Sequence, residues 1–271
     1  MTATSPLFEL RGVGFDYDGI PALRGLSLQI DCGQRLALVG ANGSGKSTLL
    51  RILDGLYSPT QGALYFDGQE VTAQLLQRDD FALPFRRRVG LVFQNPDVQL
   101  FNPTVFDEIA FAPLQLGWSR EQVLSRVERT LDYMRLTSLR DRPPYRLSGG
   151  EKKRVALASV LVLDPEVLLL DEPTATLDPR SQSEVIDLIQ EWKGSSKTVI
   201  SATHQLEIVE DIADRMLVLE EGRVAASGTP AEILSNRDLL LRANLVHAHR
   251  HSHNGVVHSH PHIHTHSKHE H

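Results

Sequence analysis

The segment from residue 40 to residue 48 has the residue types and spacing of a phosphate-binding loop. It reads Gly40-Ala41-Asn42-Gly43-Ser44-Gly45-Lys46-Ser47-Thr48 and fits the pattern G-x4-G-K-[ST]. Its glycines permit backbone angles at which a side chain would clash, so N–H groups can turn toward phosphates at the positive end of a following helix. Lys46 supplies a compact cation, and the Ser47 hydroxyl is placed to ligate Mg²⁺. A plain glycine turn with a surface lysine is disfavoured, because a strand pattern precedes the loop and a helical pattern follows it.

Two adjacent carboxylates follow a second apolar run. Asp171 ends Val167-Leu168-Leu169-Leu170, which predicts a central parallel strand. A carboxylate at the C-terminal end of such a strand lies where open α/β sheets bind ligands, so we expect Asp171 to hold Mg²⁺ through water. Glu172 is the candidate general base that orients and polarises an attacking water. The alternative, two acidic caps of the next helix, is weakened by the Pro173-Thr174 that follows directly.

A second anion-binding segment lies between the loop and the acidic pair. Leu147-Ser148-Gly149-Gly150-Glu151 precedes a long helical pattern, and Ser148 with two glycines at a helix start presents backbone N–H groups to an anion. With these motifs in this order, the chain resembles the nucleotide-binding subunit of an ABC transporter across about residues 6–235.

The resemblance implies that ATP with Mg²⁺ binds between two chains. In this family Ser148, Gly149 and Gly150 would cap the γ-phosphate held by the partner's phosphate loop. One chain contains one loop and one such segment, so two complete sites require two chains, most simply a head-to-tail homodimer with two-fold symmetry.

Three further residues take expected roles from the same resemblance. His204 follows the apolar run 199–203 and matches the switch histidine that contacts the γ-phosphate, although a lone histidine is more often structural. Gln94 matches the glutamine that senses Mg²⁺ and water and couples them to a membrane partner. Tyr17 matches the aromatic residue that stacks on adenine; Phe15 competes for this role, but alternation with Val13 indicates that Phe15 faces the core.

The fold that we expect is α/β, a P-loop NTPase with a RecA-like parallel core. An antiparallel β subdomain should cover about residues 6–33 and be joined by residues 63–66. A helical subdomain at about 95–165 should contain helices at 105–114 and 119–136, and residues 215–227 should form a hairpin that turns at Glu221-Gly222. The nucleotide-binding domain is placed at 6–235 and a C-terminal extension at 236–271.

The segment after Gln94 narrows the type of transporter. Residues 95–101 and 104–113 resemble the ATPases of energy-coupling-factor importers, in which an ATPase pair drives a transmembrane coupling protein and a substrate-capturing membrane protein. Glu108, Phe111 and Pro113 are candidate groove residues for the coupling helices, whereas we expect Ile109 on the core face of its helix.

Composition excludes several classes of function. The 271 residues carry a formal charge of −6 and no basic arm, so nucleic acid is not an expected partner. No apolar run approaches the length of a membrane span, and no signal peptide is apparent. We therefore expect a peripheral protein at the cytoplasmic face of the membrane, where another chain supplies the span. Cys32 stands alone, which excludes disulfides within the chain and predicts a small core residue.

Eleven of the twelve histidines lie in the last 25 residues. Small or polar residues separate them, which predicts a disordered tail, and imidazoles without thiolates suit Ni²⁺, Co²⁺, Zn²⁺ or Cu²⁺. A pH-responsive solubilising tail and incidental metal binding are the alternatives. The histidines in question are His247, His249, His251, His253, His258, His260, His262, His264, His266, His269 and His271.

The importer type and the tail together favour uptake of Ni²⁺ or Co²⁺, with the tail buffering or sensing metal. One alternative is the ATPase of a conventional zinc or manganese importer, which the 99–113 segment disfavours. A non-transport regulatory or DNA-maintenance ATPase would carry long coiled-coil insertions or a second nucleotide domain, and the sequence has neither. A metal-storage protein would not need Lys46, Glu172 and His204 together.

Overall fold

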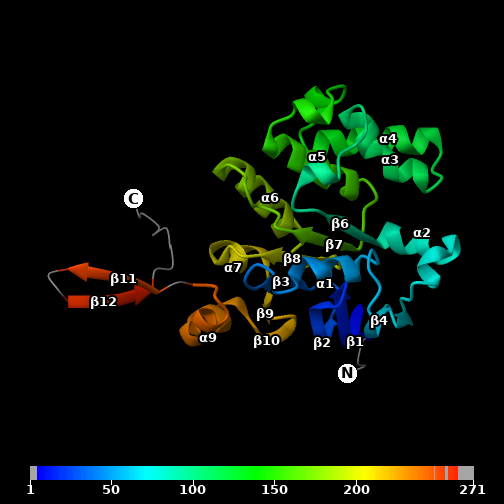
Figure 1. Ribbon diagram of the computed structural model, residues 1–271. Helices are drawn as coiled ribbons and strands as arrows, with labels where there is room; N and C mark the ends of the chain where they lie inside the picture. Colours follow the sequence, from blue (N-terminus) through cyan, green and yellow to red (C-terminus); the bar gives the residue numbers. More distant parts are fainter. Residues whose placement is uncertain (1–4, 247, 254–255, 262–271) are drawn as a thin grey trace.

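The computed structural model describes residues 5–246, 248–253 and 256–261. Figure 1 shows a helical lobe on one side of a six-stranded sheet and a four-stranded sheet on the other. The described part contains no helix long and apolar enough to cross a membrane.

The six-stranded sheet has the order β10-β9-β3-β8-β7-β6, and only its edge strand β10 runs antiparallel to its neighbour. Alternate residues of β3 pack into two different hydrophobic cores. Leu36 and Leu38 lie in the core shared with the four-stranded sheet, and Ala37 and Val39 lie in the core shared with the helical lobe. Burial on both faces explains why this strand reads as an apolar run. The strands are β3 (Arg35–Val39), β6 (Val89–Val92), β7 (Val167–Asp171), β8 (Thr198–Thr203), β9 (Arg215–Glu220) and β10 (Arg223–Gly228).

The four-stranded sheet is antiparallel in the order β2-β1-β4-β5. It confirms the predicted antiparallel subdomain and contributes to the same core as α1 (Lys46–Leu53). Helix α1 buries Leu49, Leu50, Ile52 and Leu53 there. The strands are β1 (Phe8–Tyr17), β2 (Ile20–Ile30), β4 (Gln61–Phe66) and β5 (Gln69–Glu70).

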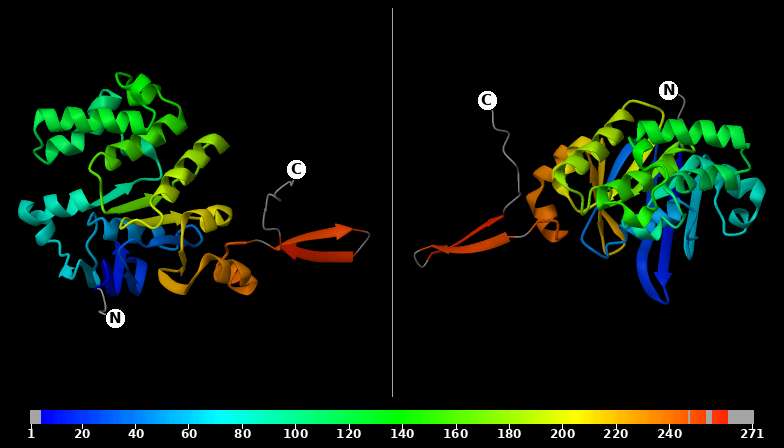
Figure 2. Two further views of the ribbon diagram at one scale, coloured as in Figure 1. Left: turned by 180° about the vertical axis from the view of Figure 1, so that it is seen from behind. Right: turned by 90° about the horizontal axis from the view of Figure 1, so that it is seen from above.

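The helical lobe confirms both predicted amphipathic helices. Helix α3 (Val105–Gln115) begins after Thr104, whose side chain accepts a hydrogen bond from the Asp107 N–H. Helix α4 (Arg120–Tyr133) begins with a capping box at Ser119, and α5 (Gly149–Leu161) packs with α3. Figure 2 shows the three helices together at one end of the molecule, in green and yellow-green.

The remaining helices flank the sheet or connect its strands. The α-helices are α2 (Asp79–Arg88), α6 (Pro179–Glu191), α7 (Val209–Ile212), α8 (Pro230–Ser235) and α9 (Arg237–Arg242). Short 3₁₀ turns are η1 (Leu75–Gln77), η2 (Pro96–Val98), η3 (Thr137–Leu139), η4 (Pro144–Arg146) and η5 (Leu206–Ile208). Leu240 of α9, and Val246 after it, belong to the same core cluster as the helical lobe, so the packed body continues to residue 246.

Two expectations about single segments are corrected. The tail was expected to be disordered without a ligand, but within it β11 (Ala248–His253) and β12 (Val256–Pro261) form an antiparallel pair. For residues 247, 254–255 and 262–271 the expectation lies outside the described residues. The alternating His-x-His sequence matches the period of two of a strand, which gives this pairing a physical reason. Cys32 was expected in the core, but it is exposed, and its Sγ donates to the Ser196 carbonyl oxygen at 3.1 Å.

Candidate functional site

The phosphate loop connects β3 to α1, as the sequence predicts. Gly45 has φ 104° and precedes the first residue of α1, a conformation that L-residues rarely adopt. A Cβ at Gly40 would lie 2.4 Å from the Leu219 carbonyl oxygen, so close packing requires this glycine even without unusual angles. The loop is therefore shaped by its contacts with β9 as well as by its own turns.

Lys46 lies within the curve of this loop. Its Nζ donates to the carbonyl oxygens of Gly40 at 2.8 Å and Ala41 at 3.1 Å, and the side chain is buried. Burial lowers the pKa of Lys46, while the carboxylates of Glu172 and Asp171 oppose that shift. A phosphate at the loop would give this cation an anionic partner in place of neutral carbonyl dipoles.

The side chains of Ser47 and Asp171 form a hydrogen bond at the end of the parallel strands. The Ser47 hydroxyl at the start of α1 donates to Oδ1 of Asp171 at the end of β7, at 3.0 Å. Burial raises the pKa of Asp171, and the hydrogen bond from Ser47 lowers it. Two side-chain oxygens from segments 124 residues apart are thus brought together at the edge where the parallel strands end.

Glu172 and His204 form a second pair beside the first. Oε1 of Glu172 lies 2.8 Å from Nδ1 of His204, while its Oε2 is buried and has no hydrogen-bond partner. Glu172 also has φ 46°, a left-handed conformation that costs a non-glycine residue on the order of 1–3 kcal/mol. The structure therefore holds a carboxylate oxygen free to accept a hydrogen bond inside the site, as a general base requires.

The aromatic side chain of Tyr17 lies beside α1. Its hydroxyl is 3.2 Å from the Thr48 hydroxyl, and the residue is 39% exposed. Phe15 instead stacks on Tyr57, with ring centroids 5.0 Å apart, and packs against the core. Tyr17 is therefore the more exposed of the two rings, and its stacking on adenine stays a prediction.

The Ser148 segment caps α5 and faces solvent. The Ser148 side chain accepts from the Glu151 N–H, and the Glu151 carboxylate accepts from the Ser148 N–H at 2.7 Å. The N–H groups of Gly149 and Gly150 remain at the open helix start, where anions are favoured. Among the described residues, no hydrogen bond joins this segment to the phosphate loop. A Cβ at Gly149 would meet no atom within 4 Å, whereas one at Gly150 would lie 2.4 Å from the Ser181 Oγ.

Gln94 follows β6 but makes no side-chain hydrogen bond to Ser47 or Asp171 in the described chain. Its backbone is held instead by α5. The buried Lys153 donates to the carbonyl oxygens of Phe93 at 3.0 Å and Gln94 at 3.5 Å. Gln99 also donates to the Ala156 carbonyl oxygen at 2.9 Å.

Sequence reasoning missed the role of Lys153 in linking α5 to the Gln94 segment. Lys153 stands in the basic run Lys152-Lys153-Arg154, and nothing in that run distinguishes the buried lysine from its two charged neighbours. Burial lowers the pKa of Lys153 to about 8, although the negative charges of Asp171 and Glu172 raise it in part.

The expected groove residues on α3 behave differently from one another. Phe111 is exposed, and its ring meets that of Phe101 edge-on at 5.0 Å. Glu108 is buried and accepts from the N–H groups of Phe101 and Asn102, so it shapes the preceding loop and does not face a groove. Pro113 is buried as well, and Ile109 lies in the core as predicted.

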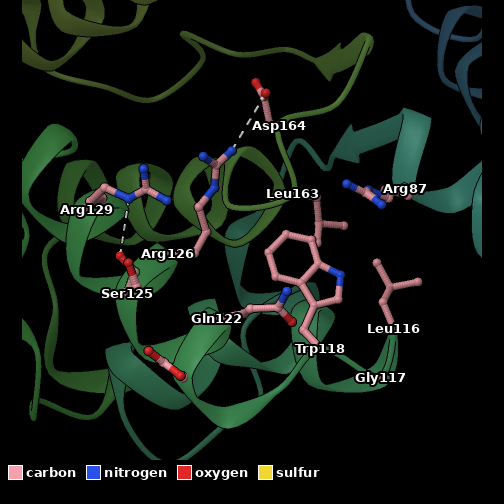
Figure 3. A pocket seen from close by; sticks show the side chains of 11 residues that line it. Arg87, Leu116, Gly117, Trp118, Gln122, Ser125, Arg126, Arg129, Leu163 and Asp164 are labelled. Carbon is pink, nitrogen blue, oxygen red and sulfur yellow. Dashed lines mark hydrogen bonds and ion pairs between the residues drawn. The ribbon is translucent and has the colours of Figure 1, made fainter.

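A separate cavity of about 720 Å³ lies in the helical lobe (Figure 3). Its walls include Arg87, Trp118, Arg126 and Asp164, and none of the predicted site residues. Arg126 donates to the Val162 carbonyl oxygen at 2.7 Å, which ties α4 to the end of α5. The cavity therefore lies apart from the predicted nucleotide site at the edge of the sheet.

A parallel sheet with a phosphate loop, paired Ser47 and Asp171 oxygens and a buried glutamate define a P-loop ATPase. The capped, open start of α5 adds the second anion-binding segment. The ABC transporter family model matches residues 23–175, and the chain belongs to this family as an ABC-type ATPase.

Curated relatives agree over nearly the whole chain. The nickel import ATP-binding protein NikO of Rhodobacter capsulatus is 55% identical over 245 residues, which cover 89% of this chain and 96% of NikO. The energy-coupling factor transporter ATP-binding protein EcfA2 of Methanospirillum hungatei is 45% identical, covering 89% of this chain and 60% of that protein.

Solved structures show the same fold. CbiO1 from Clostridium perfringens, described as part of the ABC transporter complex cbiONQ, has a TM-score of 0.74 at 35% identity and covers 89% of this chain and 95% of that one. MJ0796, described as a dimeric bacterial ABC transporter cassette, has a TM-score of 0.73 at 28% identity, covering 82% of this chain and 98% of that one.

Proposed function

We propose that this chain is the ATP-hydrolysing subunit of an energy-coupling-factor importer that brings Ni²⁺ or Co²⁺ into the cell. The observation that carries the proposal is the 55% identity to a nickel import ATP-binding protein over 96% of that protein's length. The histidine-rich C-terminal segment is a second feature in keeping with a transition-metal cargo.

Each residue at the edge of the sheet would have its own role in binding or hydrolysing ATP. Lys46 and the loop N–H groups bind the β- and γ-phosphates, and Tyr17 stacks on the adenine. Oε2 of Glu172 accepts the proton of a water aligned with the γ-phosphate, while His204 orients Glu172 through Oε1. The N–H of Glu172 donates to the Ala202 carbonyl oxygen at 2.9 Å, which holds the backbone of Glu172 against β8.

The residues present fit Mg²⁺ with the nucleotide. Ser47 and Asp171 offer hard oxygen ligands at 3.0 Å from each other, and Mg²⁺ prefers such ligands together with phosphate oxygens and waters. When bound, the ion would neutralise charge on the phosphate oxygens. Gln94 would join this set when its loop moves toward Asp171.

Two copies would complete each site. The open N–H groups of Gly149 and Gly150 would meet the γ-phosphate bound to the partner's loop, which gives a two-fold, head-to-tail dimer. A Cβ at Gly149 would meet no atom within 4 Å outside its own helix backbone and chain neighbours. This space on the outside of the chain is available for the partner's nucleotide.

The membrane partners would dock on the exposed apolar residues beside the Gln94 segment. Phe101 is 67% and Phe111 is 38% exposed, and they contact each other. Lys153 and Gln99 link this surface to α5, so movement at the nucleotide can reach the coupling protein and the substrate-capturing protein through one helix. The subunit would then lie at the cytoplasmic face of the membrane.

Metal uptake by cells that produce the complete complex would test the proposal. With wild-type chain we expect ATP-dependent accumulation of Ni²⁺ or Co²⁺, and with Glu172→Gln we expect none while the complex still assembles. Phe111→Asp should prevent co-purification of the membrane proteins, whereas Val224→Asp, at an exposed position on β10, should not. Accumulation of Zn²⁺ or Mn²⁺ alone, or Ni²⁺ uptake that is unaffected by Glu172→Gln, would overturn it.

A further inference from the structure

A second side-chain hydrogen bond joins the two loops that carry Glu172 and His204. Thr174, two residues after Glu172, donates from Oγ1 to Oε1 of Gln205, the residue that follows His204, at 2.5 Å. Thr174 is fully buried, and Gln205 is half-buried. Side chains therefore link the two loops twice, once through Glu172 and His204 and once through Thr174 and Gln205.

Packing holds the ring of His204 only in part. The side chain is 55% exposed, so contacts with neighbouring atoms do not fix the imidazole from all sides. Among the described residues, its side-chain hydrogen bond is the contact of Nδ1 with Oε1 of Glu172. The position of the ring therefore depends on where the backbone of residues 203–205 lies.

The backbone around Gln205 is held by contacts on both sides. Its N–H donates to Oγ1 of Thr203, the last residue of β8, at 3.0 Å, and its side chain accepts from Thr174. Thr174 is held in turn by α6, because Nε2 of Gln182 donates to the carbonyl oxygens of Thr174 at 3.4 Å and Leu177 at 3.1 Å. These contacts connect the end of β8 to α6 through the loop between β7 and α6.

We propose that Thr174 and Gln205 are positioning residues that set the geometry of the Glu172–His204 pair for ATP hydrolysis. The inference rests on the proposed role of Glu172 as the general base. Oε1 of Glu172 contacts His204 and the buried Oε2 has no partner, so a displaced His204 would let the carboxylate turn away from the attacking water. Thr174 and Gln205 act through this pair and not on the nucleotide, so their loss lowers kcat and leaves ATP binding intact.

Removal of the Thr174 hydroxyl at constant shape tests the first partner. In steady-state hydrolysis by the full-length chain, Thr174→Val should lower kcat by about tenfold and leave KM for ATP within about twofold, because a small displacement of a catalytic group slows chemistry without weakening binding. Thr174→Ser keeps the hydroxyl and should restore most of the turnover.

Thr198→Val is the matched control. Thr198 is also fully buried, and it begins β8 at the end of the strand opposite to Thr203. Its Oγ1 accepts a hydrogen bond from the Gly33 N–H at 3.0 Å, so the substitution also removes a buried hydroxyl from its hydrogen bond. It should reduce the free energy of unfolding, as Thr174→Val does, and leave kcat unchanged.

Two double variants separate positioning from a general loss of stability. Thr174→Val with Gln205→Met should lower kcat no more than either change alone, because both remove the same hydrogen bond. In a His204→Ala background, Thr174→Val should change kcat by less than about threefold, since the residue that it positions is absent. If Thr174→Val lowers kcat equally with and without the His204 ring, or leaves kcat unchanged, the positioning role is wrong.

Two further measurements keep the outcomes distinct. Gln205→Met removes the acceptor at a half-buried position, so it tests the same hydrogen bond if Thr174→Val does not fold. Glu172→Gln separates this inference from the proposed function. Full turnover in Glu172→Gln would refute the general base itself, whereas lost turnover there with normal kcat in Thr174→Val and Gln205→Met would refute only the positioning role.

Discussion

Nδ1 of His204 lies 2.8 Å from Oε1 of Glu172, and this contact leaves the buried Oε2 as the carboxylate oxygen without a partner. The two residues follow β7 and β8, which are neighbours in the sheet. One oxygen is thus used for orientation and the other is available for chemistry.

Glu172→Gln should bind ATP normally and hydrolyse it about 10²- to 10⁴-fold more slowly, the range expected for loss of general-base catalysis. The amide keeps the shape of the side chain but cannot accept a proton from water. Nucleotide binding and steady-state turnover should be measured on the same preparation. His204→Ala removes the contact that orients Glu172 and should lower turnover less, because the carboxylate is kept. Near-normal turnover in Glu172→Gln would disprove the proposed role.

Asp171→Asn should raise the Mg²⁺ concentration needed for half-maximal hydrolysis by about tenfold or more, because a neutral amide is a weaker ligand than a carboxylate. Ser47→Ala should act in the same direction, since the two oxygens lie 3.0 Å apart in one site. Titration of ATPase activity with Mg²⁺ at saturating ATP measures both. An unchanged Mg²⁺ requirement in both variants would exclude this pair as the ion's ligands.

Ser148→Arg should prevent ATP from driving dimer formation in a Glu172→Gln background. The bulky cation would fill the open start of α5 and weaken the dimer by more than about tenfold. Ser119→Arg is a matched control, because Ser119 caps α4 with the same type of capping box and is also exposed. Light scattering with and without ATP should separate the two. Equal dimerisation by both variants would show that the Ser148 segment lies outside the interface.

Because the pKa of Lys153 is lowered in the folded chain, the free energy of unfolding should change with pH between about 8 and 10.5. The folded chain loses this proton near pH 8, whereas the unfolded chain keeps it to about 10.5. Between these values the unfolded state binds more protons, so the free energy of unfolding rises with pH, by up to about 3 kcal/mol. Denaturant unfolding of wild type and Lys153→Met should be compared from pH 7 to 10. A constant difference between them across this range would contradict the shift.

The sequence by itself determined where the phosphate loop and the acidic pair lie. Roles could be predicted for Lys46, Ser47 and Glu172 because the pattern is local: a strand, a glycine turn and a helix start lie within a few residues of one another, and a strand ends beside Glu172. The amphipathic helices of the lobe were predictable for the same reason, since their periodicity and the caps at Thr104 and Ser119 are local signals.

Only the tertiary structure decided which residues meet across long stretches of chain. Nothing local in the sequence places Lys153 under the backbone of Gln94, or aims Glu108 at the N–H groups of the loop before α3. The prediction of Cys32 as a core residue was wrong, because a position just after a strand can face either the core or solvent and the local sequence does not show which. The pairing of β11 with β12 follows the same principle, because the register of two strands is contained in neither strand's sequence alone.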